Sequence, residues 1–237
     1  MKPEKELAEA AKRKAALAAV KHVKDGFVMG LGSGSTASYA IEALGERIKR
    51  EKLNLLAVPT SYQAFLLAVK CGIAVTTLDE HPAIDVTIDG ADQIDAKLNL
   101  IKGMGAALTR EKIVASVSKQ NVIIADESKK VRVLGENNHP VPIEVLPFAI
   151  TTVKRRIEAV GGKAVLREGK GKLGPVITDN GNAIIDASFG TISNAAELEK
   201  KLKMIPGVVE TGLFIGLADI AYVGTASAVE KIERKRK

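Results

Sequence analysis

Short apolar runs alternate with helix-forming stretches of ten or more residues through the first half of this chain. The predicted strands of that half are 27–31, 53–58, 74–77, 84–88 and 121–125. The predicted helices are 4–24, 36–50, 62–71 and 109–118. Strands that alternate with helices of this length are typical of a parallel sheet with helices on its faces. The sequence therefore predicts an α/β fold.

The pattern changes after Val133, where residues 135–140 form a polar, turn-rich break. Beyond the break lie predicted strands at 141–145, 163–167, 176–179 with its extension 183–186, and from 208, and predicted helices at 148–160 and 195–203. The order β-α-β-β-α-β is the split arrangement of a ferredoxin-like domain. A stretch at 213–223 and a final helix are expected to return to the first sheet. We therefore expect one domain at 1–134 plus 209–237 and a second at 135–208.

Composition restricts the class of protein further. No apolar run approaches the roughly 20 residues that cross a bilayer, and the amino end is rich in Lys and Glu rather than built like a signal peptide. The single cysteine, Cys71, allows no internal disulfide and is typical of a reducing compartment. We expect a cytoplasmic protein with no membrane partner.

The charge balance is basic, with 35 Lys and Arg against 28 Asp and Glu. The positive charge is dispersed, and its densest cluster, 231–237, is expected to be the solvated end of a helix. Aromatic residues make up only 3% of the chain, so stacking platforms for nucleic acid are scarce. A small anionic ligand explains the mild positive bias, and no nucleic-acid partner is expected.

A glycine-rich loop, Gly30–Thr36, follows the first predicted strand and opens a helix. Backbone N–H groups in such a loop and the helix amino end favour a bound anion, and the hydroxyls of Ser33, Ser35 and Thr36 add donors. The alternative is a tight turn with serine caps. A dinucleotide site is disfavoured because no carboxylate ends the second strand, and a P-loop because the loop has no lysine.

Two carboxylates, Asp89 and Asp92, flank Gly90 and Ala91 just after a predicted strand. The carboxyl ends of parallel strands are where α/β sheets bind ligands. Two such groups can hold sugar hydroxyls or divide into an acid and a base. Turn chemistry and an oxygen-ligated Mg²⁺ are the alternatives.

Glu111 lies in the first turn of a predicted helix, where a carboxylate also complements the helix dipole. Helical spacing places Glu111 on a face of small or apolar residues with Val114, Ala115 and Ser118, a setting suited to a general base. Lys102, in a glycine-broken loop, is either a solvated lysine or a positive charge for a developing oxyanion.

Five segments resemble the A-type ribose-5-phosphate isomerase family. They are GLGSGST at 30–36, VTIDGAD at 86–92, IKGMGAALTREKI at 101–113, VITDNGN at 176–182 and IPGVVETGLF at 205–214. The resemblance implies a Rossmann-like domain that carries a smaller ferredoxin-like lid. It also implies interconversion of ribose 5-phosphate and ribulose 5-phosphate in the non-oxidative pentose phosphate pathway, without cofactor or metal, by a homodimer or homotetramer.

The resemblance assigns roles to single residues. It implies that the substrate phosphate is held by Ser33, Gly34, Ser35 and Thr36, with Lys12 where the family often places a phosphate-contacting lysine. Asp89 and Asp92, with Gly90 and Ala91 between them, contact the sugar and help to open its ring. Glu111 moves the proton between C1 and C2, and Lys129 binds substrate.

The resemblance also implies that Lys102 and the amides of Gly103, Met104 and Gly105 stabilise the enediolate oxygen. The family commonly has three consecutive glycines after the lysine, and Met104 departs from that pattern.

Two alternatives share the expected fold. A non-catalytic sugar-phosphate-binding regulator could lose Glu111 and Lys102, and regulators usually add a DNA-binding domain. A deaminating isomerase or a CoA-transferase relative would not predict Lys102 and Glu111 at this spacing. This chain keeps both residues, which favours the isomerase.

Overall fold

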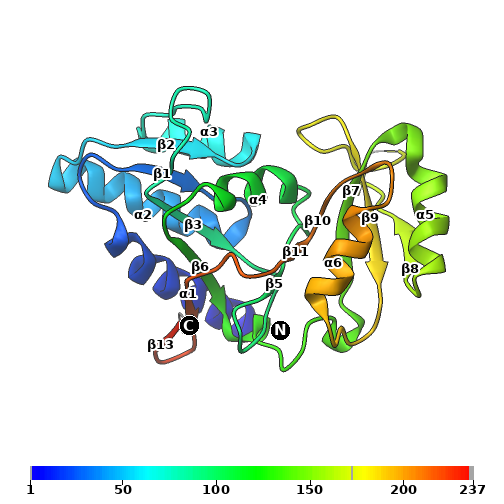
Figure 1. Cartoon of the computed structure of the whole chain (residues 1–237). Helices are drawn as coiled ribbons and strands as arrows, with labels where there is room; N and C mark the ends of the chain where they lie inside the picture. The colour runs from blue at the N-terminus through cyan, green and yellow to red at the C-terminus, as the bar shows by residue number, and fades with distance from the viewer. Residues whose placement is uncertain (1, 172, 235–237) are drawn as a thin grey trace. The chain divides into compact units, whose positions relative to one another are not determined.

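The computed structural model describes residues 2–171 and 173–234. It divides the chain into two compact units (Figure 1). The first unit comprises Met1–Ala91, Arg110–Lys130 and Leu217–Lys237, and the second comprises Asp92–Thr109 and Val131–Gly216. Each unit has its own sheet and core and is described by itself.

The first unit is built on a six-stranded sheet of order β13-β12-β6-β3-β1-β2. Its strands are β1 (Val28–Leu31), β2 (Leu56–Pro59), β3 (Val86–Gly90), β6 (Asn121–Asp126), β12 (Ile220–Gly224) and β13 (Val229–Glu233). All neighbouring pairs run parallel except β12 and β13. The predicted parallel α/β sheet is confirmed.

Helices of the first unit cover this sheet. They are α1 (Lys2–Ala19), η1 (Val20–His22), α2 (Ser35–Glu51), α3 (Tyr62–Cys71), α4 (Leu108–Ser116) and the short η2 (Glu127–Lys129). Helix α1 packs on β6, β12 and α2 through its alanines, such as Ala15 and Ala16. Helix α3 begins where the Ser61 hydroxyl accepts a hydrogen bond from the Ala64 N–H, and it ends at Gly72 with φ 75°.

The second unit contains a four-stranded antiparallel sheet of order β10-β7-β9-β8. Its elements follow the chain as η3 (Glu136–Asn138), β7 (Val141–Val145), η4 (Pro147–Ala149), α5 (Ile150–Ala159), β8 (Lys163–Leu166), β9 (Ala183–Ser188), α6 (Ala195–Lys203) and β10 (Val208–Thr211). A smaller sheet joins β4 (Gln93–Ile94), β5 (Leu100–Ile101) and β11 (Leu213–Phe214). The predicted β-α-β-β-α-β order is confirmed.

The compact units differ from the predicted domain boundaries. Residues 92–109, 131–134 and 209–216 belong to the second unit, although they were expected in the first. The cause is packing: Ile101, Leu134 and Leu213 join the core of the antiparallel sheet. Short two-residue strands such as β4 and β5 carry no periodic signal that would assign them to one core or the other.

Three predicted elements are wrong. Residues 74–77 form only an isolated bridge between Val75 and Ala57, and 176–179 only one between Ile177 and Ala183. The expected final helix is replaced by β13, whose Lys and Glu side chains lie on an edge strand paired with β12. The alternation of apolar and polar residues that predicts a strand is weak in a charged edge strand, because much of such a strand faces water. The end of the predicted basic tail, 235–237, lies outside the described residues.

Strand β3 begins two residues later than predicted, so Asp89 and Gly90 are its last residues rather than a following turn. Parallel pairing continues to Gly90 opposite Ile124 of β6.

Over residues 2–171 and 173–234, no helix combines the length and apolar character needed to cross a bilayer.

Candidate active site

The predicted site residues are distributed over both units. The first unit holds Lys12, the glycine loop, Asp89 to Ala91, Glu111 and Lys129. The second unit holds Asp92 and the loop 102–105.

In the first unit, the glycine loop and Asp89 meet at the carboxyl ends of β1 and β3. A Cβ on Gly32 would lie 2.1 Å from Asp89 Oδ1, so only glycine fits beside this carboxylate. The same oxygen accepts hydrogen bonds from the Ser33 N–H at 3.3 Å and the Gly90 N–H at 2.7 Å. Asp89 is only 3% exposed. The structure therefore joins two of the predicted motifs into one cluster.

The hydroxyl of Ser33 is held by two residues that directly follow the adjacent strand β2. It lies 2.8 Å from Thr60 Oγ1 and donates to Ser61 Oγ at 2.6 Å. The Gly34 N–H donates to Gln63 Oε1 at 2.8 Å. These three partners were missed by the sequence analysis. For Thr60 and Ser61 the available signal is that this polar pair directly follows Pro59 at the end of a predicted strand.

Helix α2 begins at the end of this loop. Its cap residue, Gly34, has φ 93°, a conformation that favours glycine. The first N–H groups of a helix have no carbonyl partner within that helix, so the amides of Ser35, Thr36 and Ala37 open toward the loop. The positive end of the helix dipole adds to them. This arrangement suits an anion such as phosphate.

Glu111 lies in the first turn of α4 and is 5% exposed. The helix is seated on β1 through Val114, since a Cβ on Gly30 would lie 2.4 Å from Val114 Cγ1. Ser118, just beyond the helix, pairs its hydroxyl with that of Thr87 on β3 at 2.6 Å. Val114 and Ser118, on the predicted small and apolar face of α4, therefore contact the sheet.

The two lysines of the first unit that were predicted as site residues lie on different elements. Lys12 of α1 pairs with Glu9 at 2.9 Å, and Glu9 also accepts a hydrogen bond from the hydroxyl of Tyr39 on α2. That hydrogen bond raises the pKa of Tyr39 above its ordinary value. Lys129 is half-buried in η2, directly after β6.

In the second unit, Lys102 follows β5 and is only 3% exposed. Its ammonium lies 5.4 Å from the centre of the Phe214 ring, a cation–π distance. The backbone N–H of Lys102 donates to the Gly212 carbonyl at 2.9 Å. Gly212 must be glycine, because a Cβ there would lie 2.2 Å from the Lys102 carbonyl oxygen. Lys102 is therefore a buried cation rather than a solvated one.

The loop after Lys102 is joined to Asp92. The Met104 N–H donates to Asp92 Oδ2 at 3.0 Å. Gly103 has φ 110° and needs glycine, whereas the described non-glycine residues with positive φ do not include Met104. Methionine is therefore compatible with the loop, with a side chain that is 46% exposed.

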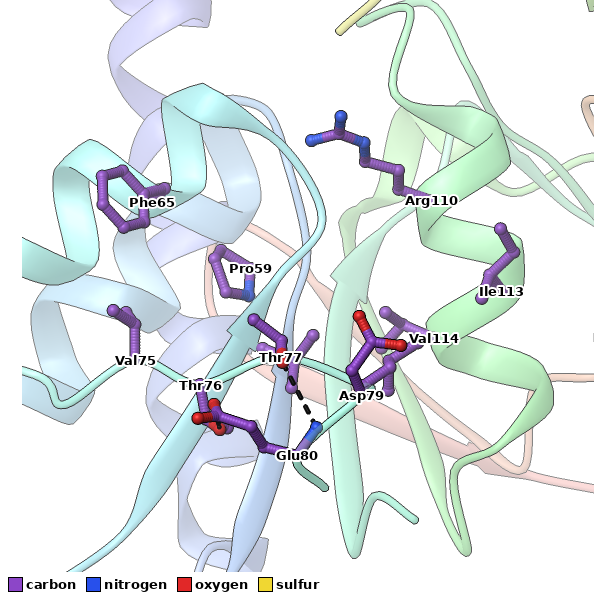
Figure 2. A pocket seen from close by; sticks show the side chains of 12 residues that line it. Pro59, Phe65, Val75, Thr76, Thr77, Asp79, Glu80, Arg110, Ile113 and Val114 are labelled. Atoms are coloured by element: carbon purple, nitrogen blue, oxygen red, sulfur yellow. Dashed lines mark hydrogen bonds between the residues drawn. The ribbon is translucent and has the colours of Figure 1, made fainter. Parts of the chain in front are cut away.

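A pocket of about 610 Å³ in the first unit lies apart from these motifs (Figure 2). Helix α4 contributes Arg110, Ile113 and Val114 to it, and Phe65 comes from α3. Its lining includes none of the predicted site residues. Among the described side chains, no three His, Cys, Asp or Glu residues are grouped as in a metal centre.

The sequence profile of ribose 5-phosphate isomerase A (phosphoriboisomerase A) matches residues 56–228. Ribose-5-phosphate isomerase A of Methanothermobacter thermautotrophicus is 50% identical over 219 residues, which cover 92% of this chain and 96% of that protein. The solved ribose 5-phosphate isomerase A of Methanocaldococcus jannaschii is 48% identical with a TM-score of 0.91, over 95% of this chain and 99% of the other.

A D-ribose-5-phosphate isomerase solved in complex with phospho-erythronic acid is 48% identical with a TM-score of 0.93. The alignment covers 96% of this chain and 99% of the relative. The profile match and the alignments with these relatives agree, and the chain therefore belongs to the ribose 5-phosphate isomerase A family.

Proposed function

We propose that this member of the isomerase family interconverts D-ribose 5-phosphate and D-ribulose 5-phosphate with one carboxylate, that of Glu111. The observation that carries the proposal is the buried position of this carboxylate in the first turn of α4. The carboxylate takes the proton from C2 of the open aldose and returns it to C1. Both steps occur on one face of a planar enediolate, so a single base serves both.

The glycine loop is proposed to bind the substrate phosphate. The hydroxyls of Ser33, Ser35 and Thr36 and the first amides of α2 would surround it, and Lys12 would add charge. Support comes from the open amino end of α2 and from the fixed Ser33 side chain. A phosphate held away from the reacting carbons supplies binding energy that orients them.

The segment from Asp89 to Asp92 is proposed to hold the sugar and assist ring opening. Asp89 is supported by its position against Gly32 and by the two backbone N–H groups that donate to it. Asp92 is supported by its contact with the Met104 amide. Gly90 and Ala91 bring the two carboxylates within three residues of each other.

Lys102 and the backbone of Gly103, Met104 and Gly105 are proposed to stabilise the enediolate oxygen. A buried ammonium acts in a low dielectric, where charge stabilisation is stronger than in water. Lys129 is proposed as a further substrate contact. We also propose that the chain binds phospho-erythronic acid, whose carboxylate presents two oxygens as the enediolate does.

Replacement of Glu111 tests this mechanism. Glu111→Gln keeps the shape of the side chain and removes the base, so kcat for ribose 5-phosphate should fall about 10²–10⁴-fold. Affinity for phospho-erythronic acid should stay within about tenfold, because the phosphate site is intact. Lys112→Gln, a change at the next position of the same helix, serves as control. Near-normal kcat in Glu111→Gln would exclude Glu111 as the proton carrier.

A homodimer or homotetramer is proposed from the outer face of α3. Tyr62, Phe65, Leu66 and Val69 are exposed at helical spacing, while Ala64 and Ala68 face the core. Ile113 of α4, which lines the same pocket as Phe65, adds a further exposed apolar side chain, and a group of exposed apolar side chains of this kind marks an interaction site.

The occupant proposed for this face is a second copy of the chain. The pocket beside α3 offers an apolar hollow, and it is lined by both Asp79 and Arg110 (Figure 2). A two-fold contact uses the same patch on both partners, so opposite charges and a ridge beside a hollow within one patch make it self-complementary.

Light scattering coupled to size exclusion tests the interface. Leu66→Glu should shift the protein to monomer, whereas Leu173→Glu, at an exposed leucine of the second unit, should not. A monomeric unaltered protein would refute the oligomer, and an oligomeric Leu66→Glu variant would refute this face.

A cytoplasmic location is proposed from the single cysteine and is checked by cell fractionation.

A further inference from the structure

Arg167, directly after β8, has a guanidinium that the mechanism above does not use. Its side chain is 12% exposed. It forms a two-point pair with Asp186 of β9, with Nε to Oδ2 at 2.8 Å and Nη2 to Oδ1 at 2.5 Å. Such bidentate pairs fix the orientation of the guanidinium plane.

The same guanidinium binds the loop that follows Lys102. Its Nη1 donates to the carbonyl of Gly103 at 2.9 Å and to the carbonyl of Met104 at 3.0 Å. Nη2 also lies 3.8 Å from Met104 Sδ. Arg167 thus connects Asp186 to two successive peptide units of the loop, 63 and 64 residues away in sequence.

The Gly103 carbonyl also accepts a hydrogen bond from the Ala106 N–H at 3.0 Å, and together with the contacts of Arg167 this bond determines where two amides point. In a trans peptide the C=O and the following N–H point in opposite directions, and the described chain has no cis peptide. With the Gly103 carbonyl toward Arg167, the Met104 N–H points away from it, toward Asp92 Oδ2. With the Met104 carbonyl toward Arg167, the Gly105 N–H also points away from it.

We propose that Arg167, held by Asp186, is a positioning residue for two amides of the loop: that of Met104, which donates to Asp92, and that of Gly105, which is proposed to stabilise the enediolate. The inference rests on the proposed role of loop 102–105. It also accounts for Met104 in place of glycine, because the loop is anchored through main-chain carbonyls, which every residue has.

A purely structural role for Arg167 is the alternative. Residue 186 pairs with Val165 across β8 and β9, so the Arg167–Asp186 pair could simply stabilise that hairpin. The two roles differ in their effect on the loop. A structural pair changes the melting temperature alone, whereas a positioning residue changes amide exchange in the loop and kcat while KM stays nearly constant.

The experiment compares Arg167→Lys and Arg167→Met with the control Arg132→Met. Arg132 also binds a carboxylate in the same unit, with its Nε and Nη2 both donating to Glu136 Oε1. Hydrogen exchange of the Met104 and Gly105 amides, kcat, KM, phospho-erythronic acid affinity and melting temperature are measured for each. A displacement of about 1 Å at donors of this kind can cost about 10²-fold in rate.

We expect faster exchange of both amides in the Arg167 variants, kcat lower by about 10²-fold, and KM within about threefold of the unaltered protein. Phospho-erythronic acid should bind more weakly, while inhibition by inorganic phosphate is unchanged. The Arg132 variant should match the unaltered protein in exchange and rate.

The outcomes separate the two ideas. Unchanged amide exchange in a folded Arg167 variant overturns the positioning role itself. Faster exchange with unchanged kcat overturns the role of the loop amides in the proposed mechanism. If Arg167→Met does not fold, Arg167→Lys decides, because the ammonium keeps the charge but its three donors cannot replace the four hydrogen bonds of Arg167 to Asp186 and the two carbonyls.

Discussion

Gly32→Ala is the most direct test of the contact between the glycine loop and Asp89. The added methyl group would lie 2.1 Å from Asp89 Oδ1, 2.3 Å from its Cγ and 2.5 Å from its Cα. A carboxylate can rotate away, but the Cα is main chain within β3. Ordinary contact begins at 3.4 Å, so the ends of β1 and β3 must separate by about 1 Å.

Such a displacement has two measurable consequences. Overpacking of this kind typically costs about 1–3 kcal/mol, which corresponds to a melting temperature lower by about 3–10 °C in a chain of this size. Because the displacement moves Asp89 and the Ser33 N–H out of position, kcat/KM should fall about 10²-fold.

The assay follows conversion of ribose 5-phosphate beside thermal unfolding, with Gly26→Ala as control. Gly26 has φ 76° and open space around it, so alanine there should cost stability of about 1 kcal/mol through backbone strain alone. The control should keep its kcat/KM. A Gly32→Ala variant with kcat/KM within threefold of the unaltered protein would refute the argument from close contact.

Three further predictions concern metal, phosphate and pH. Activity should survive exhaustive EDTA treatment, because the proposed chemistry needs a carboxylate and a positive oxyanion site; loss restored by one divalent ion would instead assign Asp89 and Asp92 to a metal. Free ribose should be a very poor substrate in kcat as well as KM, and sulfate should compete with ribose 5-phosphate; equal kcat/KM for ribose would exclude the loop as a phosphate site. The hydrogen bond from Lys119 lowers the pKa of Asp85 below 3.8, so this pair stabilises the fold above that pH and the contribution is lost as pH falls through the lowered pKa. Asp85→Asn should therefore lower the melting temperature at pH 7 more than at pH 2.5, and an equal loss at both would contradict that assignment.

Local signals in the sequence were sufficient for much of the fold. The bounds of α3 follow from a serine cap, Ser61, and a closing glycine, Gly72, which lie directly before and after the helix. Helix α6 begins and ends as predicted, at Ala195 and Lys203. The β-α-β-β-α-β order and the parallel sheet follow from periodicity, which each segment carries independently of its neighbours. The sequence also placed Glu111 on a face that packs, because helical spacing alone decides which residues share a side.

Contacts between distant segments were decided only by tertiary structure. The hydroxyl of Ser33 is held by Thr60 and Ser61, 27 and 28 residues away, because β2 pairs with β1. The charged segment 229–233 becomes a strand because β12 offers it a partner, which overrides the propensity of Lys and Glu for helix. Arg167 reaches the Met104 loop only because β8 ends beside it in the folded second unit. The sequence determined which residues are proposed to carry the chemistry, and the long-range pairing of strands determined which side chains hold them in place.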